Sequence, residues 1–475
     1  MANEISPAVS TRAVEQLIQG LCMGRTHLHA VKLYRGDELL LRYAVSPYRC
    51  DDRREIYSLS KIFTSTACGL CYDRKLLTPD DRVEDWFPEY REQWKKDERF
   101  ARLKIRHLLT MSTGHDHCVM GEMAMAEDSV KAFFETPLCY EPGERFVYST
   151  GATCLAAEIV RRASGKNVPD LLAEKVLPTL GIEPFFYECC ADGHCVGGSG
   201  FNLSCDDVAQ LGRLYLGRGV YQGERLLSDE WVRMATSSQI DNNRNLTPDW
   251  SSGYGFQFWQ CAGGGFRGDG AFGQLCVIVP EKNLVFTMLG ECVSDMQAEM
   301  DAVHGFLHSF EQKDKGLAKV TECYTAKHSW YPCAWFDTVT ERPDCDTGER
   351  LMNDNAAEIE TVRLVKQEKQ AKLMLRLYDG TVETITANAD TWTDGKLYLK
   401  NYKPVLRELI SRKDRQCIRY SALLCPDCNA VVFELRLRNT PQSMQLRLWE
   451  NGGRLVMKSI CASGLVGSDI QLIER

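Results

Sequence analysis

The stretch SLSKIFTSTACGLCYDRKLL, residues 58–77, decides the fold of this 475-residue chain. It opens with the only Ser-x-x-Lys motif in the sequence, SLSK at 58–61. The apolar residues that follow recur at helical spacing, so the pattern predicts a helix that begins near residue 58. In such a helix Lys61 lies one turn above Ser58 on the same face, within reach of its hydroxyl.

A serine and a lysine at this spacing have a chemical use. A serine hydroxyl is a weak nucleophile until a neighbour accepts its proton. Lys61 can accept that proton if burial lowers the lysine pKa, or can relay it to another base if it stays charged. The helix N-terminus adds backbone N–H groups and a positive dipole end where negative charge develops. Alone, the tetrapeptide is better explained as a helix cap with an exposed lysine.

Two later segments favour the catalytic interpretation. Tyr148 follows a Pro-Gly turn at 142–143, and a tyrosine near an ammonium group can have its phenol pKa lowered and act as a base toward Ser58. The segment GDGAFGQ (268–274) precedes a predicted hairpin, where glycines allow close backbone approach to a ligand. A backbone N–H there can join that of Ser58 in an oxyanion hole. Taken singly, a half-buried tyrosine and a flexible loop also explain these segments.

Around these motifs the chain alternates helical and strand patterns. Apolar runs predict a hairpin at 29–44, a strand at 254–259 and a second hairpin at 275–288. Helical patterns are expected at 105–111, 149–165, 206–215, 228–236 and 294–310. Residues 1–312 are therefore predicted to form an α+β domain with a mostly antiparallel sheet.

The pattern of apolar and polar residues changes after residue 312. Residues 313–356 are polar and irregular and are expected to form a linker. Short strand-like segments then follow at 361–366, 373–378, 382–387, 430–437 and 444–449. They predict a small β-rich C-terminal domain over 357–475, built as a barrel or a sandwich.

Composition excludes several classes of function. A net charge of -8 and a pI near 5.7 provide no basic surface for nucleic acid or an anionic membrane. No stretch approaches the ~18 apolar residues that a membrane span needs, and the first residues lack the pattern of a secretory signal. The 21 cysteines, an odd and scattered set, suit a reducing compartment. We expect a cytoplasmic protein with mostly free cysteines.

The order of the three motifs resembles that of the serine β-lactamase and penicillin-binding-protein superfamily. Further stretches resemble its class C β-lactamase and D-alanyl-D-alanine carboxypeptidase branch, which also holds esterases and amidases. These stretches are KIRHLLTMSTG (104–114), PGERFVYSTGATCLAAEIVRRASG (142–165), GGSGFNLSCDDVAQLGRLYLGRGVYQGERLLSDEWV (197–232) and YGFQFW (254–259). The resemblance covers about residues 10–310. It implies an antiparallel sheet flanked by helices, with an all-helical lobe inserted between the first and third motifs.

The resemblance also implies roles for individual residues. Ser58 matches the acylated serine, Lys61 the lysine beside it, and Tyr148 the tyrosine that moves protons. The backbone N–H groups of Ser58 and Ala271 match the oxyanion hole. The matching positions for substrate binding are Thr150, Arg267, Gly268, Asp269 and Gly270. No metal or organic cofactor is expected.

Two positions depart from the family pattern. Thr150 stands where the family often has asparagine, so an amide that orients the substrate is missing. Gly268 stands where a lysine or histidine holds the substrate carboxylate, unless Arg267 substitutes for it. These departures favour an esterase or amidase over a dedicated β-lactamase or carboxypeptidase.

The expected partner is a small ester or amide, including D-amino-acid-containing ones, and the oligomeric state is left open. The alternative is a catalytically inactive ligand-binding or sensor protein of the same fold. A metal site at Cys425 and Cys428, or at the cysteine and histidine residues of 115–118 and 189–195, is a weaker alternative.

Overall fold

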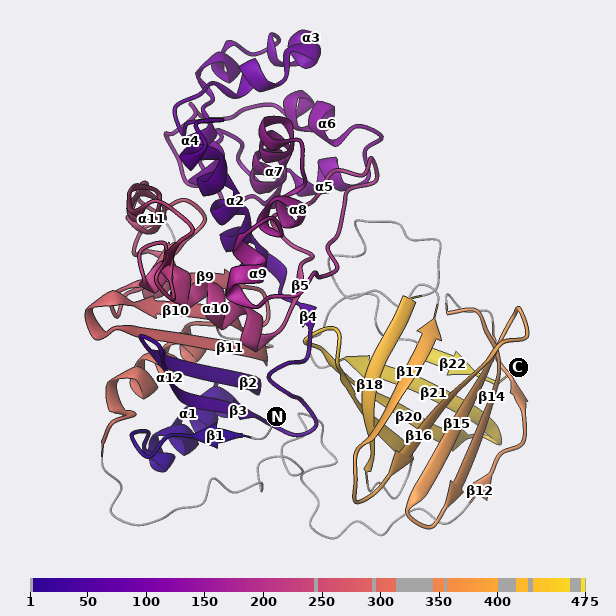
Figure 1. Cartoon of the computed structure of the whole chain (residues 1–475). Coiled ribbons are helices and arrows are strands. Elements are labelled where there is room, and N and C mark those ends of the chain that lie inside the picture. The colour runs from indigo at the N-terminus through magenta and orange to yellow at the C-terminus, as the bar shows by residue number, and fades with distance from the viewer. Residues whose placement is uncertain are drawn as a thin grey trace. The chain divides into compact units, whose positions relative to one another are not determined.

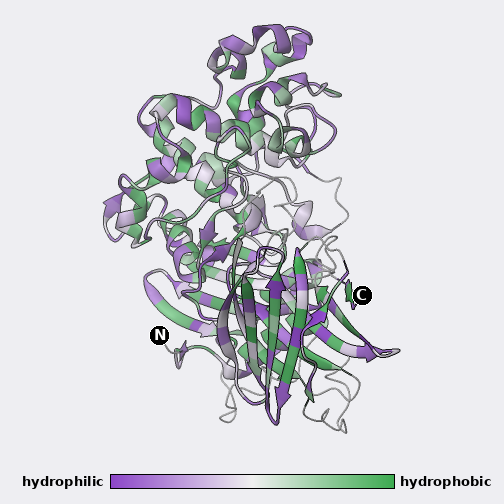
Figure 2. Cartoon of the chain, turned by 90° about the vertical axis from the view of Figure 1, so that its right-hand side faces the viewer, coloured by the Kyte–Doolittle hydropathy of each residue, from purple (hydrophilic) through white to green (hydrophobic). Residues whose placement is uncertain are grey.

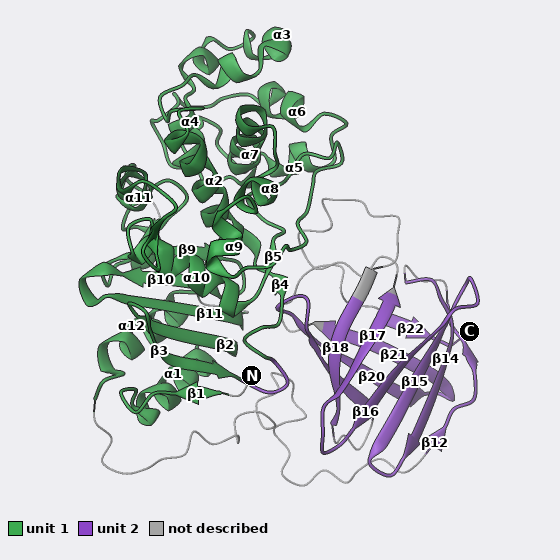
Figure 3. Ribbon diagram, in the orientation of Figure 1, with its two compact units in different colours: residues 1–44, 49–320 green, residues 45–48, 321–475 purple. Residues whose placement is uncertain are grey.

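The computed structural model of the chain (Figure 1) describes residues 3–242, 247–292, 296–312, 345–353, 357–399, 416–425, 430–461 and 471–474. The chain divides into two compact units, residues 1–44 with 49–320 and residues 45–48 with 321–475 (Figure 3). Most of the predicted linker, residues 313–344, lies outside the described residues. Within the described chain, no helix is both long enough and apolar enough to cross a membrane.

Unit 1 is built on a seven-stranded sheet in which every neighbouring pair is antiparallel. In spatial order its strands are β1 (Glu4–Ile5), β3 (Glu38–Ala44), β2 (Thr26–Arg35), β11 (Leu284–Cys292), β10 (Gln274–Val279), β9 (Phe266–Gly270) and β8 (Trp259–Gln260). Both predicted hairpins are confirmed, β2–β3 and β10–β11. The second hairpin turns through Asn283, which adopts a left-handed conformation.

Helices cover both faces of this sheet because neighbouring strand residues point to opposite sides. On β11, Phe286 packs its ring 5.8 Å from that of Phe306 on α12 (Met296–Ser309). The next residue toward the N-terminus, Val285, lies against α10 (Cys205–Leu216), where a Cβ on Gly212 would be 2.7 Å from its side chain. The helix α1 (Thr11–Met23) packs beside α12, with Gly20 close to Ala302.

The segment between the first and third motifs forms a helical lobe (Figure 1). Its helices are α2 (Lys61–Asp73), α3 (Arg91–Trp94), α4 (Ile105–Leu109), α5 (Met120–Ala124), α6 (Ser129–Glu135), α7 (Thr150–Ser164), α8 (Val168–Leu172) and α9 (Val176–Leu180). The chain then returns to the sheet through α10 and α11 (Asp229–Thr236). The predicted α+β fold with an inserted helical lobe is confirmed.

Helix ends in unit 1 carry residues that commonly cap helices. Ser204 and Asp207 form a reciprocal capping box at the start of α10. Ser228 accepts a hydrogen bond from the Trp231 N–H at the start of α11. Gly165 ends α7 in the left-handed conformation.

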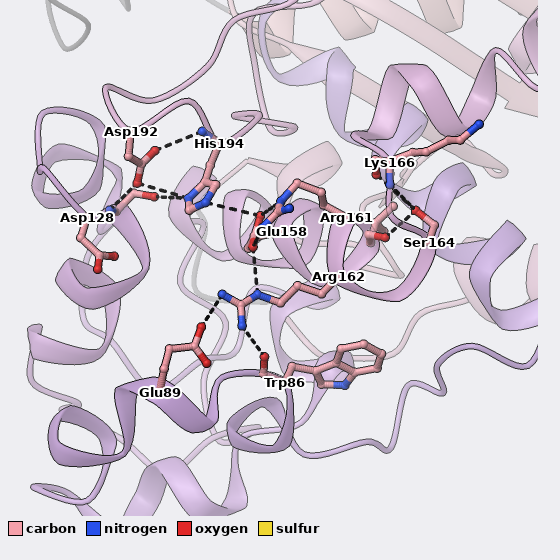
Figure 4. Close-up of polar contacts among 12 residues, drawn as sticks. Trp86, Glu89, Asp128, Glu158, Arg161, Arg162, Ser164, Lys166, Asp192 and His194 are labelled. Atoms are coloured by element: carbon pink, nitrogen blue, oxygen red, sulfur yellow. Dashed lines mark hydrogen bonds and ion pairs between the residues drawn. The ribbon is translucent and has the colours of Figure 1, made fainter.

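A buried carboxylate on α7 joins several parts of the lobe (Figure 4). Glu158 is 3% exposed and accepts hydrogen bonds from Arg161 and Arg162. Arg162 also donates to the carbonyl of Trp86 and pairs with Glu89, so it connects α7 to the segment before α3. On the other side, His194 lies 3.7 Å from Glu158.

The described residues of unit 2 between 345 and 474 form one eleven-stranded sheet. Its strands are β12 (Cys345–Asp346), β13 (Arg350–Leu351), β14 (Ile359–Gln367), β15 (Gln370–Leu377), β16 (Val382–Asn388), β17 (Thr393–Leu399), β18 (Gln416–Cys425), β19 (Val431–Leu437), β20 (Ser443–Asn451), β21 (Arg454–Cys461) and β22 (Gln471–Ile473). The sheet curls until its ends meet, where Met352 bridges Glu474. Figure 2 shows hydrophobic and hydrophilic residues alternating along these strands, and the apolar set packs into one core.

The strand predicted at 254–259 is wrong for most of its length. Only Trp259 belongs to a strand, β8, while Tyr254 makes isolated bridges. Gln257 has φ +71, which an extended strand does not allow. Its side-chain amide instead donates to the carbonyls of Leu108 and Leu109, and this contact holds the backbone in a turn.

Candidate active site

Ser58 lies in a short 3₁₀ helix, η1 (Tyr57–Ser60), that runs directly into α2. The predicted helical start at residue 58 is thus present, with its first turn tighter than an α-helix. Ser58 is partly exposed, whereas Lys61 is only 1% exposed. The Lys61 Nζ lies 3.1 Å from the Ser58 Oγ, so the motif brings these two groups together as its spacing predicts.

The Lys61 amine has two further partners. It donates to the Thr150 Oγ1 at 3.1 Å and to the Gly198 carbonyl oxygen at 2.7 Å. Gly198 was not predicted from the sequence, and it lies 137 positions from Lys61 in the chain. It has to be small, since a Cβ there would be 2.9 Å from the Thr150 Cγ2.

Burial changes the acid–base behaviour of this lysine. Desolvation lowers the pKa of Lys61 to about 7, although the nearby Cys118 and Asp269 oppose the change. A neutral amine has two N–H bonds and one lone pair. It can therefore donate to Thr150 and Gly198 while its lone pair faces the hydroxyl of Ser58.

Tyr148 lies across the site from Ser58. Its ring covers the amine, with the Lys61 Nζ 4.9 Å from the ring centroid, and it stacks on Trp259 at 5.4 Å. Burial raises the pKa of the Tyr148 phenol, and its interaction with Ser58 only partly offsets that rise. The expected lowering of the Tyr148 pKa is therefore wrong, because desolvation outweighs the lowering effects of the Ser58 hydrogen bond and the Arg267 charge.

The third motif packs directly against the segment that carries Ser58. A Cβ on Gly270, the last residue of β9, would lie 2.4 Å from the carbonyl oxygen of Ile56. A Cβ on Gly268 would lie 2.6 Å from the Leu59 Cδ1. Ala271 follows in the turn after β9 and is partly exposed. The structure thus places the turn that contains Ala271 beside η1.

Arg267, the alternative cation of the third motif, makes its contacts inside the protein. Its side chain is fully buried, donates to the carbonyl oxygens of Asp249 and Gln260, and lies over the Trp250 ring at 4.6 Å. It also pairs with Asp269 at 3.2 Å. These contacts direct the Arg267 side chain into the protein interior, and its part in holding a substrate carboxylate stays a prediction.

Asp269 is largely buried on the same strand. Burial raises the pKa of its carboxyl group, and Arg267 opposes that rise. Its charge influences both Lys61 and Tyr148. Asp269 is thus close to the site, and a direct role in substrate binding stays a prediction.

Two residues at this site were not given this role from the sequence. Cys118 is exposed and its Sγ accepts a hydrogen bond from the Thr150 N–H at 3.3 Å. The sequence offered Cys118 only as part of a metal-binding option. Gln274, the first residue of β10, donates to carbonyls of the turn that contains Ala271. Its only sequence signal was its place at the end of the third motif.

The metal-binding options gain no support. Among the residues whose positions are described, no cluster of three or more histidine, cysteine, aspartate or glutamate side chains is arranged to bind a metal. Cys428 lies outside the described residues, so the pair with Cys425 stays a prediction.

Comparison with known proteins agrees with the fold and identifies the family. The family model described as Beta-lactamase matches residues 24–304, more than half of the chain. The 6-aminohexanoate-dimer hydrolase of Paenarthrobacter ureafaciens is 23% identical over 309 residues, which cover 59% of this chain and 76% of that protein. Penicillin-binding protein 4* of Bacillus subtilis (strain 168) is 27% identical over 147 residues, 29% of this chain and 31% of that protein.

Solved structures are similar in fold. A penicillin-binding protein homolog from Caulobacter crescentus has a TM-score of 0.51 at 14% identity, covering 63% of this chain and 97% of that chain. EstCE1, a hydrolase with promiscuous acyltransferase activity, has a TM-score of 0.51 at 17% identity, covering 62% and 98%. The family match includes Ser58, Lys61, Tyr148 and the third motif, and it shows that the chain belongs to the beta-lactamase family.

Proposed function

We propose that the protein is a serine hydrolase that cleaves an ester or amide through an acyl-enzyme at Ser58. One observation carries the proposal: a buried lysine with its pKa near neutrality lies at hydrogen-bond distance from a partly exposed serine. A lysine in that state is a competent general base at physiological pH.

The first half of the reaction uses the groups around Ser58. The Ser58 hydroxyl proton passes to the neutral Lys61 amine while the Oγ attacks the substrate carbonyl carbon. The oxyanion that forms accepts hydrogen bonds from the backbone N–H groups of Ser58 and Ala271. Because its pKa is raised, Tyr148 stays protonated and donates to the leaving group. Lys61 then returns the proton to Tyr148, and the acyl group remains on Ser58.

The second half reverses these proton transfers. A water molecule attacks the acyl carbon and gives its proton to Lys61. The bond between the acyl carbon and the Ser58 Oγ breaks, and Ser58 regains its proton from the lysine. The products are a carboxylic acid and the free alcohol or amine, so no redox partner is required.

The residues present favour a substrate without a carboxylate beside the scissile bond. Gly268 offers no cation, and Arg267 is turned into the protein interior. The hydrolase relative from Paenarthrobacter, whose name gives a 6-aminohexanoate dimer as its substrate, is consistent with a small acyl substrate. We therefore place simple esters and amides ahead of β-lactams.

Hydrolysis assays test this proposal. Purified protein should cleave p-nitrophenyl esters or D-aminoacyl p-nitroanilides faster than nitrocefin, and Ser58→Ala should abolish turnover. Ser60→Ala is the matched control, because Ser60 is fully buried and donates to the Tyr57 carbonyl. No turnover by folded protein on any of these substrates, together with binding of one of them, would favour the ligand-binding alternative.

A further inference from the structure

We propose that Gln274 is a positioning residue for the oxyanion hole, which rests on the proposed function of Ser58. Its side-chain amide fixes the turn that carries Ala271, and so sets the place of one of the two backbone donors. Gln274 touches neither the substrate nor the reacting atoms. It acts through the backbone of the turn after β9.

The contacts of Gln274 are concentrated on one side of its amide. The Nε2 lies 2.8 Å from the carbonyl oxygens of Phe272 and Gly290, and 3.3 Å from that of Ala271. Three carbonyl oxygens around Nε2 fix the orientation of the amide, since the opposite orientation would place four oxygens together. The Gln274 amide thereby connects Ala271 and Phe272 to Gly290 on the neighbouring strand β11.

The Oε1 atom of Gln274 makes no hydrogen bond among the described residues that would favour a glutamine at position 274. The Gln274 side chain is 0% exposed, and its Oε1 has no hydrogen-bond partner among the described residues. A buried carbonyl oxygen without a partner is destabilising, because it loses its hydrogen bonds to water and gains none in the protein. The donors of Gln274 are therefore the part of the side chain that the fold uses.

The turn needs such a restraint because its backbone is strained. Phe272 has φ +66, a left-handed conformation that is unfavourable for a residue with a side chain because its Cβ approaches the following carbonyl oxygen. Gly273 follows at φ +80, packed so closely that a Cβ would lie 2.4 Å from the Glu299 Oε1. The Cys292 N–H donates to the Phe272 carbonyl at 3.0 Å, which adds a second tie to β11.

The same strain appears beside the other donor. Tyr57, immediately before Ser58, has φ +48, and its ring meets that of Phe272 edge to face with centroids 5.0 Å apart. Tyr57, beside the Ser58 donor, thus contacts Phe272, beside the Ala271 donor. Because Gln274 holds the Phe272 backbone, it also holds this contact and the spacing of the Ser58 and Ala271 N–H groups.

Misplacing an oxyanion donor lowers the rate of the chemical step more than it weakens substrate binding. We expect Gln274→Met, which keeps the side-chain length but removes the N–H donors, to lower kcat about 10- to 100-fold. KM should change by less than about threefold. Labelling by a fluorophosphonate, whose adduct is tetrahedral, should slow by a factor similar to that in kcat.

Gln257→Met is the matched control. Gln257 is also buried and its amide also donates to two carbonyl oxygens, those of Leu108 and Leu109, while its Oε1 accepts from the Thr153 hydroxyl; none of these partners belongs to the turn. Gln274→Glu adds a pH signature, because only its protonated carboxyl group can donate to Phe272. Its activity should fall with rising pH over a range in which the wild-type rate does not.

The outcomes separate the two proposals. A kcat loss in Gln274→Met that exceeds the loss in Gln257→Met, at equal thermal stability, supports the positioning role. Equal losses in both variants, or a loss confined to KM, would overturn it. Wild-type protein that neither turns over esters nor takes up the fluorophosphonate would instead contradict the proposed function.

Discussion

At the scale of single residues, the protonation state of Lys61 governs the proposed chemistry. Only the neutral amine accepts a proton, and burial lowers the pKa of Lys61 to about 7. The rate constant kcat/KM should therefore rise about tenfold per pH unit below pH 7 and level off above it. Lys61→Arg should remove the rise of kcat/KM with pH and nearly all activity, since a guanidinium stays protonated. A profile that is flat between pH 5 and 8 would contradict the role of Lys61.

Gly270 supports a second prediction at this scale. A Cβ at this position would lie 2.4 Å from the backbone oxygen of Ile56, so Gly270→Ala has to push β9 away from η1. A displacement of about 1 Å at an active site can cost about 100-fold in rate. We expect a loss of that order in ester hydrolysis. Gly121→Ala is the control, because nothing lies within 4 Å of a Cβ there, and an equal loss in both variants would contradict the account.

The sequence identified some of these residues and missed others for physical reasons. Ser58 and Lys61 are neighbours along one helix, so their spacing alone predicts their contact. Gly198 and Gln274 reach the site through the tertiary fold, and no local pattern points to them. The direction of the Tyr148 pKa shift was missed because it depends on burial, which a single sequence does not give.

At the scale of elements, the buried carboxylate of Glu158 connects several parts of the helical lobe. Glu158→Gln would leave Arg161, Arg162 and His194 without their shared carboxylate (Figure 4). Because Glu158 is buried while these cations are partly exposed, we expect a loss of about 2 kcal/mol in unfolding free energy, measured by urea denaturation.

A matched control is available in an exposed carboxylate. Glu174 also pairs with two cations, Arg74 and Lys166, but all three side chains are exposed to solvent by about a third or more. Glu174→Gln should cost less than about 1 kcal/mol. Equal losses in the two variants would show that burial of Glu158 has no energetic consequence.

Elements were predictable where local signals and packing agreed. The β10–β11 hairpin combines two apolar runs with a turn at 280–283 that suits Asn283. The strand predicted at 254–259 failed because the side chain of Gln257 bonds to α4, a contact that apolar alternation does not encode. In unit 2 the sequence analysis missed β17, β18, β21 and β22, and it assigned β12 and β13 to the predicted linker.

At the scale of the whole molecule, the proposed catalytic groups all belong to unit 1. Leu373 is fully buried in the core of unit 2, on β15. Leu373→Ala should therefore lower the stability of unit 2 by about 3 kcal/mol, seen by calorimetry as a shift in one thermal transition. The rate of fluorophosphonate labelling at 25 °C should stay unchanged. A labelling rate that falls with the stability of unit 2 would contradict the prediction that the reactivity of Ser58 depends on unit 1 alone.

The sequence predicted the organisation of the first ~310 residues in more detail than that of the C-terminal part. The three motifs pointed to the family of the first ~310 residues, because catalytic groups and their spacing recur in it. The β-rich character of the C-terminal part followed from alternation, yet the closure of its sheet at Met352 and Glu474 did not. Closure depends on pairing between segments that are 122 positions apart, and local patterns carry no information on such pairing.

The central claim is that Lys61 activates Ser58, and the mass of the intact protein after exposure to a fluorophosphonate tests it most directly. The account predicts one adduct on the wild-type protein, mapped to Ser58, absent in Ser58→Ala, and much slower to form in Lys61→Ala. Ser60→Ala should keep the adduct. No adduct on folded wild-type protein, or one that survives Ser58→Ala, would contradict the account.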